Sequence, residues 1–139
     1  MDVVHRNLVI VLFEVHVRSG KLGDLEIYRL SIELGREAWR IYGVLPKSLR
    51  YGIGSQTLRA ADSVGANIAE GFGRYHYLDS VKFYYNARGS LWECKHWFFL
   101  LKERELIDRN EYKRINNLME RLGVKLNNFI QTTKKLHAK

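Results

Sequence analysis

Apolar residues recur at intervals of three and four from Asp24 onward, which places them on one face of a helix. In the first such stretch the residues on this face are Ile27, Leu30, Leu34, Ala38, Ile41 and Leu45. Asp24 suits the N-cap position of this helix. Gly43 and Pro46 are expected to stop it, because glycine is frequent at helix ends and proline cannot continue a helix.

The same spacing predicts three more helices, over residues 55–73, 78–106 and 109–139. Ser55 and Asp79 can cap the first two of these, with the turn before Asp79 as an alternative cap. The apolar face of the second helix consists of Leu58, Ala61, Gly65, Ile68 and Phe72. The apolar face of the fourth consists of Ile115, Leu118, Met119, Leu122, Leu126, Phe129 and Ile130.

Four helices joined by short links predict an all-α domain over residues 24–139, an antiparallel up-down-up-down four-helix bundle. Residues 1–23 are expected to form an N-terminal extension. Its apolar run at residues 8–17, LVIVLFEVHV, is too short to span a bilayer and lacks a cleavage site, so no membrane partner is expected. Because β-branched residues dominate this run, it is either an edge strand or a disordered extension.

The third helix carries more apolar surface than three neighbouring helices can cover. Beyond its core-facing residues lies a basic file, Arg88, Lys95 and Lys102, and beyond that an aromatic file. The aromatic file consists of Tyr85, Trp92 and Phe99. Large exposed apolar patches usually mark contact sites. One interpretation is an interface with another copy of the chain, and we favour it; the other is a platform for single-stranded nucleic acid.

The chain is basic, with 23 Lys and Arg against 15 Asp and Glu, for a net charge of +8. This balance favours a polyanionic partner, and RNA or DNA before an acidic membrane surface. The last helix and the loop near residue 75 hold most of the excess. The candidate nucleic-acid-binding residues are Arg59, Arg74, Lys82, Arg121, Lys125, Lys134 and Lys135.

The segment 67–74, NIAEGFGR, raises the question of a phosphate-binding loop. A Walker or dinucleotide loop needs a preceding strand and a different glycine spacing, whereas these glycines follow a predicted helix and close it. The polar residues near this segment are expected to form a structural cluster that ties the second and third helices together. The members of this cluster are Asn67, Glu70, Arg88 and Glu93.

The sequence offers no catalytic residues, no metal site and no cofactor site. No nucleophile and base occur at a recognisable spacing, and the five histidines are scattered. The single cysteine, Cys94, excludes an internal disulfide and is typical of a cytoplasmic protein.

The segments 66–71, ANIAEG, and 87–93, ARGSLWE, carry a family resemblance. Together they resemble the four-helix-bundle proteins encoded in intervening sequences of bacterial 23S ribosomal RNA genes, over residues 24–135. The departures are Gly65, where the family usually has proline, and the extension 1–23. The resemblance implies a bacterial protein that assembles as a ring of five subunits. The chain is also similar to the accessory protein of diversity-generating retroelements, a basic barrel that binds nucleic acid and a reverse transcriptase.

Two functional hypotheses follow. The first is a non-enzymatic, ring-forming bundle that binds RNA or DNA through its basic surfaces with little sequence specificity. The second is a scaffold that docks a nucleic-acid enzyme such as a reverse transcriptase, with its charge serving only to steer.

Overall fold

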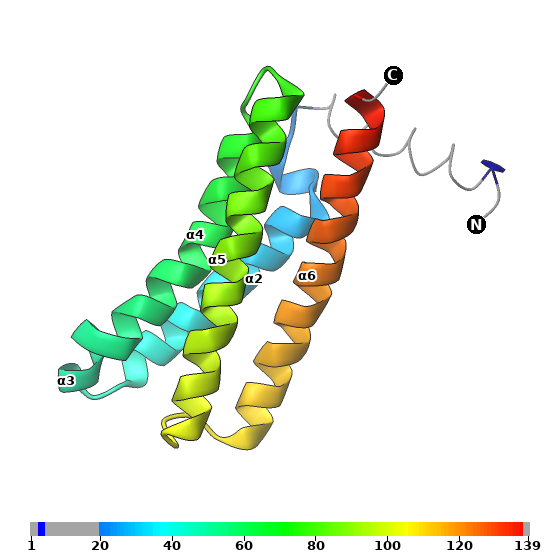
Figure 1. Ribbon diagram of the computed structural model, residues 1–139. Coiled ribbons are helices and arrows are strands. Elements are labelled where there is room, and N and C mark those ends of the chain that lie inside the picture. Colours follow the sequence, from blue (N-terminus) through cyan, green and yellow to red (C-terminus); the bar gives the residue numbers. More distant parts are fainter. Residues whose placement is uncertain (1–2, 5–19, 138–139) are drawn as a thin grey trace.

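The structure is a computed structural model that describes residues 3–4 and 20–137. Four long helices make up most of these residues (Figure 1). They are α2 (Glu26–Val44), α4 (Ser55–Phe72), α5 (Tyr77–Glu103) and α6 (Arg109–His137). The shorter elements are η1 (Leu22–Asp24), α3 (Lys47–Leu49) and η2 (Arg50–Gly54). These residues contain no strand, so the predicted all-α class with four helices is confirmed. The expected strand or disordered run at 8–17 lies outside the described residues.

Each long helix packs against two others, so the four surround a single core. Helix α2 contacts α4 and α6, and α5 contacts the same two helices from the other side (Figure 1). Every apolar residue predicted for the face of α2 is buried, and so is most of the predicted face of α6. Leu118 and Phe129 of α6 are only partly buried, because they lie at the border of its core face.

The order of contacts along neighbouring helices is reversed. Near the start of α2, Glu26 meets Lys125 in the second half of α6, whereas Glu37, further along α2, meets Arg114 near the start of α6. Similarly, Ser63 in the middle of α4 contacts Ser90 in the middle of α5, while the end of α4 lies against the start of α5.

The link between α2 and α4 is more regular than the sequence predicts. It forms the single turn α3 and then η2, a π-helical turn with a kink at Gly52. The Arg50 guanidinium donates to the carbonyl oxygens of Leu45 and Gly43, which satisfies backbone groups at the end of α2. Ser55 is not an N-cap, because η2 runs directly into α4.

Two other predicted helix ends are wrong. Leu25, not Asp24, occupies the N-cap of α2, because Asp24 ends the short helix η1. Helix α5 ends at Glu103 rather than near residue 106. There Glu105 adopts a left-handed conformation with φ of 57°, and the Leu106 amide donates to the Leu101 carbonyl oxygen. This is a Schellman ending formed without the glycine that usually marks it in a sequence.

The glycines of the 67–74 segment serve packing. Helix α4 ends at Phe72, and a Cβ on Gly71 would lie 2.6 Å from the Tyr84 ring. Gly71 therefore lets the start of α5 approach α4 and seats Tyr84 in the core. Gly65 acts likewise toward α2, because a Cβ there would lie 2.9 Å from the Ser31 hydroxyl oxygen.

Candidate nucleic-acid interface

The seven predicted nucleic-acid-binding cations do not form a single surface. Arg59 on α4, Lys82 on α5 and Lys135 on α6 are exposed. Arg74 follows α4, where it pairs with Glu70 and lies over the Phe83 ring at 4.7 Å. The remaining three lie on α6, but on two different flanks of that helix.

The flank of α6 that faces α2 is neutralised by carboxylates. Arg121 and Lys125 both bind Glu26 of α2, at 3.0 and 3.1 Å. Nearer the start of α6, Arg114 makes two hydrogen bonds to Glu37 of α2. The hydrogen bond from Lys125 lowers the pKa of Glu26, and the one from Arg114 lowers that of Glu37.

The flank of α6 that faces α5 is organised around a tyrosine instead. Lys134 donates to the Tyr85 hydroxyl at 3.2 Å, and the Arg88 guanidinium lies over the Tyr85 ring at 4.8 Å. Arg88 also donates to Asn127 of α6 at 3.3 Å. We call Tyr85, Arg88, Asn127 and Lys134 the Tyr85 cluster. Neither of its cations has a carboxylate partner within the described part of the chain.

The Tyr85 cluster is one step of a repeating pattern on α5. Each residue of the aromatic file has a cation three positions later: Lys95 lies 4.4 Å from the Trp92 ring centre, and Lys102 lies 4.7 Å from that of Phe99. These two lysines also meet carboxylates, unlike Arg88. Trp92 is 65% exposed and Phe99 44%, so the predicted interface file remains largely uncovered in a single chain, although Tyr85 is partly buried.

The predicted polar cluster of Asn67, Glu70, Arg88 and Glu93 does not form. Glu70 pairs with Arg74 just beyond the end of its own helix, and Glu93 accepts a hydrogen bond from Trp97. Asn67 donates to the Ser63 carbonyl oxygen, and a pair of serine hydroxyls, Ser63 and Ser90, links α4 to α5. Arg88 points to α6 rather than α4. In the sequence, Arg88, Lys95 and Lys102 each follow an aromatic residue by three positions. This spacing is the signal that indicates the position of Arg88 over an aromatic ring.

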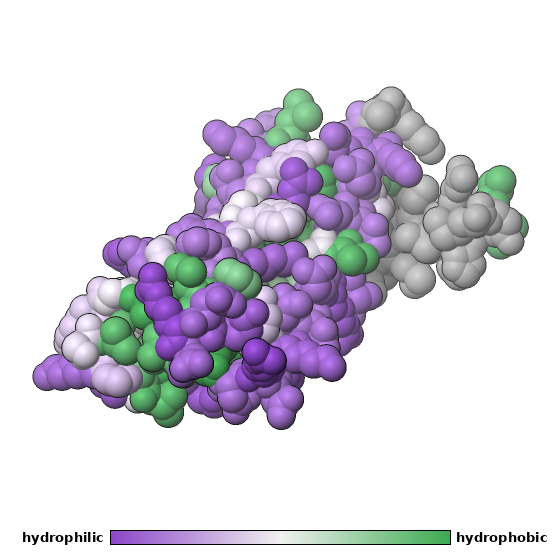
Figure 2. All heavy atoms as spheres, turned by 60° about the horizontal axis from the view of Figure 1, so that its bottom comes forward, coloured by the Kyte–Doolittle hydropathy of each residue, from purple (hydrophilic) through white to green (hydrophobic). Residues whose placement is uncertain are grey.

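A second exposed apolar surface lies on the opposite side of the bundle, along α2 and α4. A shallow groove there is floored by small residues, among them Gly35, Gly65 and Ala66, and bordered by Trp39, which is 65% exposed. Asp62 lines it, and burial raises the pKa of that carboxyl. Figure 2 shows apolar residues gathered at the α3 and η2 end of the molecule, where Val44 and Tyr51 are each 74% exposed.

The described residues contain no group of three His, Cys, Asp or Glu side chains that could hold a metal ion. The Cys94 thiol is buried, and burial raises its pKa, which keeps it protonated and poorly nucleophilic. In the same part of the chain, none of the helices is long and apolar enough to cross a membrane.

Both the sequence and the fold resemble known proteins. The model of the family described as 23S rRNA-intervening sequence protein matches residues 23–128. A crystal structure of a protein of unknown function, from the S23 ribosomal protein family of Bacteroides thetaiotaomicron, superposes with a TM-score of 0.70 at 26% sequence identity. That match covers 75% of this chain and 97% of the other. No curated protein matches the sequence. The chain belongs to the family of 23S rRNA-intervening sequence proteins.

Proposed function

We propose that this protein is a non-enzymatic bundle whose copies assemble into a closed ring and bind RNA or DNA through phosphate contacts, with little sequence specificity. The observation that carries this proposal is the Tyr85 cluster. It holds two cations, Arg88 and Lys134, against an aromatic ring and away from carboxylates. A guanidinium that stacks on an aromatic ring keeps its N–H edge available, and that edge matches phosphate oxygens.

Two further lysines extend the basic surface that the Tyr85 cluster forms. Lys82 lies on α5 one turn before Tyr85, and Lys135 follows Lys134 on α6; both are exposed. Cations without carboxylate partners release bound counterions when they meet phosphates, so they contribute affinity directly. Arg121 and Lys125 contribute less in this proposal, because a phosphate would have to displace Glu26.

Two different apolar surfaces support the ring. The exposed aromatic side chains Trp92 and Phe99 lie on α5, and the groove beside Trp39 lies between α2 and α4. Because α5 and α6 form one side of the bundle and α2 and α4 the other, these surfaces face away from each other. A contact between two different surfaces is head-to-tail, and such contacts close into rings when the rotation allows. The family resemblance gives five as the number of subunits.

The proposal also includes the finer architecture. We take residues 24–139 as one domain with an up-down-up-down antiparallel topology, and residues 1–23 as an extension outside it. The reversed order of contacts along α2 and α6, and along α4 and α5, supports this topology. It places the Tyr85 cluster toward the end of the bundle where α4 ends and α5 begins.

Binding of the full chain to a short fluorescent oligonucleotide, measured over a series of salt concentrations, tests the nucleic-acid proposal. We expect the logarithm of the binding constant to fall linearly with the logarithm of the salt concentration. Absence of binding at every salt concentration would contradict it. Capture of a nucleic-acid enzyme by a protein that binds no oligonucleotide would support the scaffold hypothesis instead.

Substitution of Trp92 by Glu tests the ring. A charge in the centre of the aromatic file should disperse the assembly into single chains, because a buried unpaired carboxylate is costly at an interface. The matched control is Val124→Glu, at an apolar residue on α6 that is also exposed (60%). Sedimentation velocity should show the control still assembled. A wild-type chain that sediments as a monomer at all concentrations would refute this part of the proposal.

A further inference from the structure

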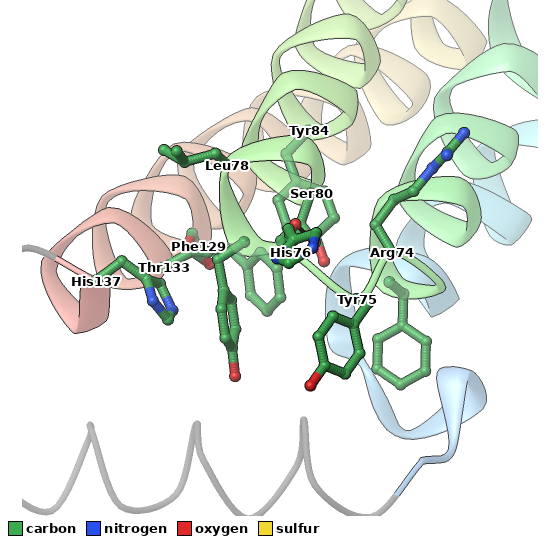
Figure 3. Close-up of a pocket in the computed structure, with 11 residues that line it drawn as sticks. Arg74, Tyr75, His76, Leu78, Ser80, Tyr84, Phe129, Thr133 and His137 are labelled. Carbon is green, nitrogen blue, oxygen red and sulfur yellow. Dashed lines mark hydrogen bonds between the residues drawn. The ribbon is translucent and has the colours of Figure 1, made fainter.

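A hollow of about 790 Å³ opens at the end of the bundle where α4 meets α5. It lies between the turn after α4, the first residues of α5 and the last turns of α6. Figure 3 shows Arg74 and Tyr75 of the turn on one side and Thr133 and His137 of α6 on the other. Its volume is in the range of sites that hold small molecules.

Aromatic side chains line much of this hollow. Tyr84 and Phe129 meet edge to face at its base, with ring centres 5.0 Å apart. Tyr77 of α5 stacks on His137 of α6 at 3.4 Å, which links the two helices at the rim. Tyr75 is 90% exposed, so one large aromatic side chain at the mouth is left without cover. Exposed aromatic rings beside cations are typical of sites that stack unpaired bases.

The charge of the lining distinguishes this hollow from the others. Its lining includes Arg74 and the two imidazoles of His76 and His137, but no Asp or Glu; the carboxylate that pairs with Arg74, Glu70, lies outside the lining. The hollow at the opposite end of α5 is lined by four carboxylates, those of Glu103, Glu105, Asp108 and Glu111. The groove between α2 and α4 contains Asp62. Of these three surfaces, only the one near Tyr75 suits a ligand with a negative charge.

The Tyr84 hydroxyl borders the hollow and is not sealed from it, because no fully buried side-chain nitrogen or oxygen in the described residues lacks a partner. Tyr84 is only 4% exposed, and within the described residues no hydrogen bond to its hydroxyl is found. The two aliphatic hydroxyls at this site already donate to carbonyl oxygens, Ser80 to that of His76 and Thr133 to that of Phe129. Burial raises the pKa of Tyr84, so its hydroxyl stays protonated and can donate. A ligand acceptor that enters the hollow can therefore accept a hydrogen bond from this hydroxyl.

We propose that this hollow binds one unpaired nucleotide of a single-stranded nucleic acid. The base stacks on Tyr75 at the mouth, a carbonyl oxygen or ring nitrogen of the base accepts the Tyr84 hydrogen bond, and the phosphate displaces the exposed Glu70 carboxylate from Arg74. The inference rests on the proposed function, since the strand reaches the hollow from the Tyr85 cluster. It adds a preference: a base held in a duplex cannot enter, so single strands bind more tightly than duplexes.

The first experiment compares Tyr75→Ala with a control. A fluorescent single-stranded RNA and the same strand annealed to its complement are titrated with the full chain. Tyr75→Ala should weaken single-strand binding by about 5-fold to 100-fold, the usual loss when one stacking aromatic is removed, and leave duplex binding unchanged. Tyr51→Ala removes a similarly exposed tyrosine at the opposite end of α4 and should change neither affinity.

The second experiment locates the base. A single strand carrying 4-thiouridine is cross-linked to the wild-type chain by near-ultraviolet light, and the modified peptides are identified by mass spectrometry. Cross-links should fall on Tyr75, Tyr84 or His137. Tyr84→Phe keeps the packing and removes only the donor, so it should weaken single-strand binding by about 2-fold to 5-fold.

The outcomes separate this inference from the proposed function. If neither strand nor duplex binds the wild-type chain, the proposed function fails, and the inference fails with it. If both bind but Tyr75→Ala weakens neither, or the cross-links fall only on α2, the hollow is not a nucleotide site while the basic surface stands. An apolar peptide as the true occupant would give this second result.

Discussion

The two flanks of α6 carry the same kind of side chain in opposite electrostatic settings. On the flank facing α2, Arg114, Arg121 and Lys125 bind carboxylates of α2. On the flank facing α5, Lys134 shares the Tyr85 ring with Arg88. A cation and its carboxylate partner together present no net charge to a distant ligand, whereas a cation over a neutral aromatic ring keeps its positive charge. The positive charge of the last helix is therefore available on one flank and largely cancelled on the other.

This difference separates two tasks of one helix. The α2 flank holds the last long helix of the bundle, α6, against the first, α2. The α5 flank leaves cations and aromatic rings accessible beside the hollow at the bundle end. Net charge alone does not reveal such a division, because it does not record which cations face carboxylates.

The largest expected effect comes from charge reversal on the α5 flank. The double substitution Arg88→Glu with Lys134→Glu should lower oligonucleotide affinity by about 10-fold to 100-fold and reduce the salt slope by about 2, since each lost phosphate contact removes about one unit. The measurement is fluorescence anisotropy over a salt series.

The matched control for that reversal is Arg121→Glu with Lys125→Glu, which places the same charges on the α2 flank. Because Glu26 already neutralises these cations, the control should lose less affinity and more stability. Equal losses of affinity for the two double variants would show that the flanks do not differ in function.

The sequence predicts the helices and their buried faces well, because burial imposes a period that is visible in residue types. Leu34, Ile68 and Leu126 lie where the spacing of apolar residues predicts, and all are buried. The ends of the helices are less predictable. Glu105 takes a conformation that usually needs glycine, and the π-turn before Ser55 replaces a cap with continuous helix.

The candidate site is only partly predictable from the sequence. The heptad pattern on α5 identifies the aromatic and basic files, but it does not say that Arg88 faces α6 rather than α4. That choice depends on the rotation of α5 about its axis, which tertiary packing sets. For the same reason the pairing of Arg121 and Lys125 with Glu26, 95 positions from Arg121, cannot be predicted from sequence spacing.

A smaller effect is expected from Glu37→Gln, which weakens the α2 flank without changing the α5 flank. Glu37 is partly buried and binds both Arg114 and Arg40, so its loss should lower the free energy of unfolding by about 1 kcal/mol. The pKa of Glu37 is lowered in the folded state. The stabilisation is therefore present above the unfolded carboxyl pKa of about 4.3 and is lost as the pH falls through the lower folded value.

Urea unfolding at neutral and acidic pH measures this effect. The difference between wild type and Glu37→Gln should shrink below about pH 4. Glu33→Gln is the control, since Glu33 is an exposed carboxylate on the same helix. A loss for Glu33→Gln as large as that for Glu37→Gln would mean that general charge, not the contact with α6, determines the effect.

The smallest effect is expected from a substitution that leaves cations without a carboxylate partner on the α2 flank, as they already are on the α5 flank. Glu26→Gln removes the carboxylate shared by Arg121 and Lys125. It should raise oligonucleotide affinity by about 2-fold to 5-fold and steepen the salt slope, because the two cations become available to phosphates. Unchanged affinity and slope would indicate that no strand reaches the α2 flank.

The most direct test of the account is the native mass of the assembly with a single-stranded oligonucleotide, for the wild-type chain and for Arg88→Glu with Lys134→Glu. Assembly depends on Trp92 and Phe99 in this account, and strand binding depends on the Tyr85 cluster. We therefore predict a wild-type mass of several subunits plus strand, and a variant of the same subunit number without strand. A wild-type monomer, or a variant assembly that retains the strand, would contradict it.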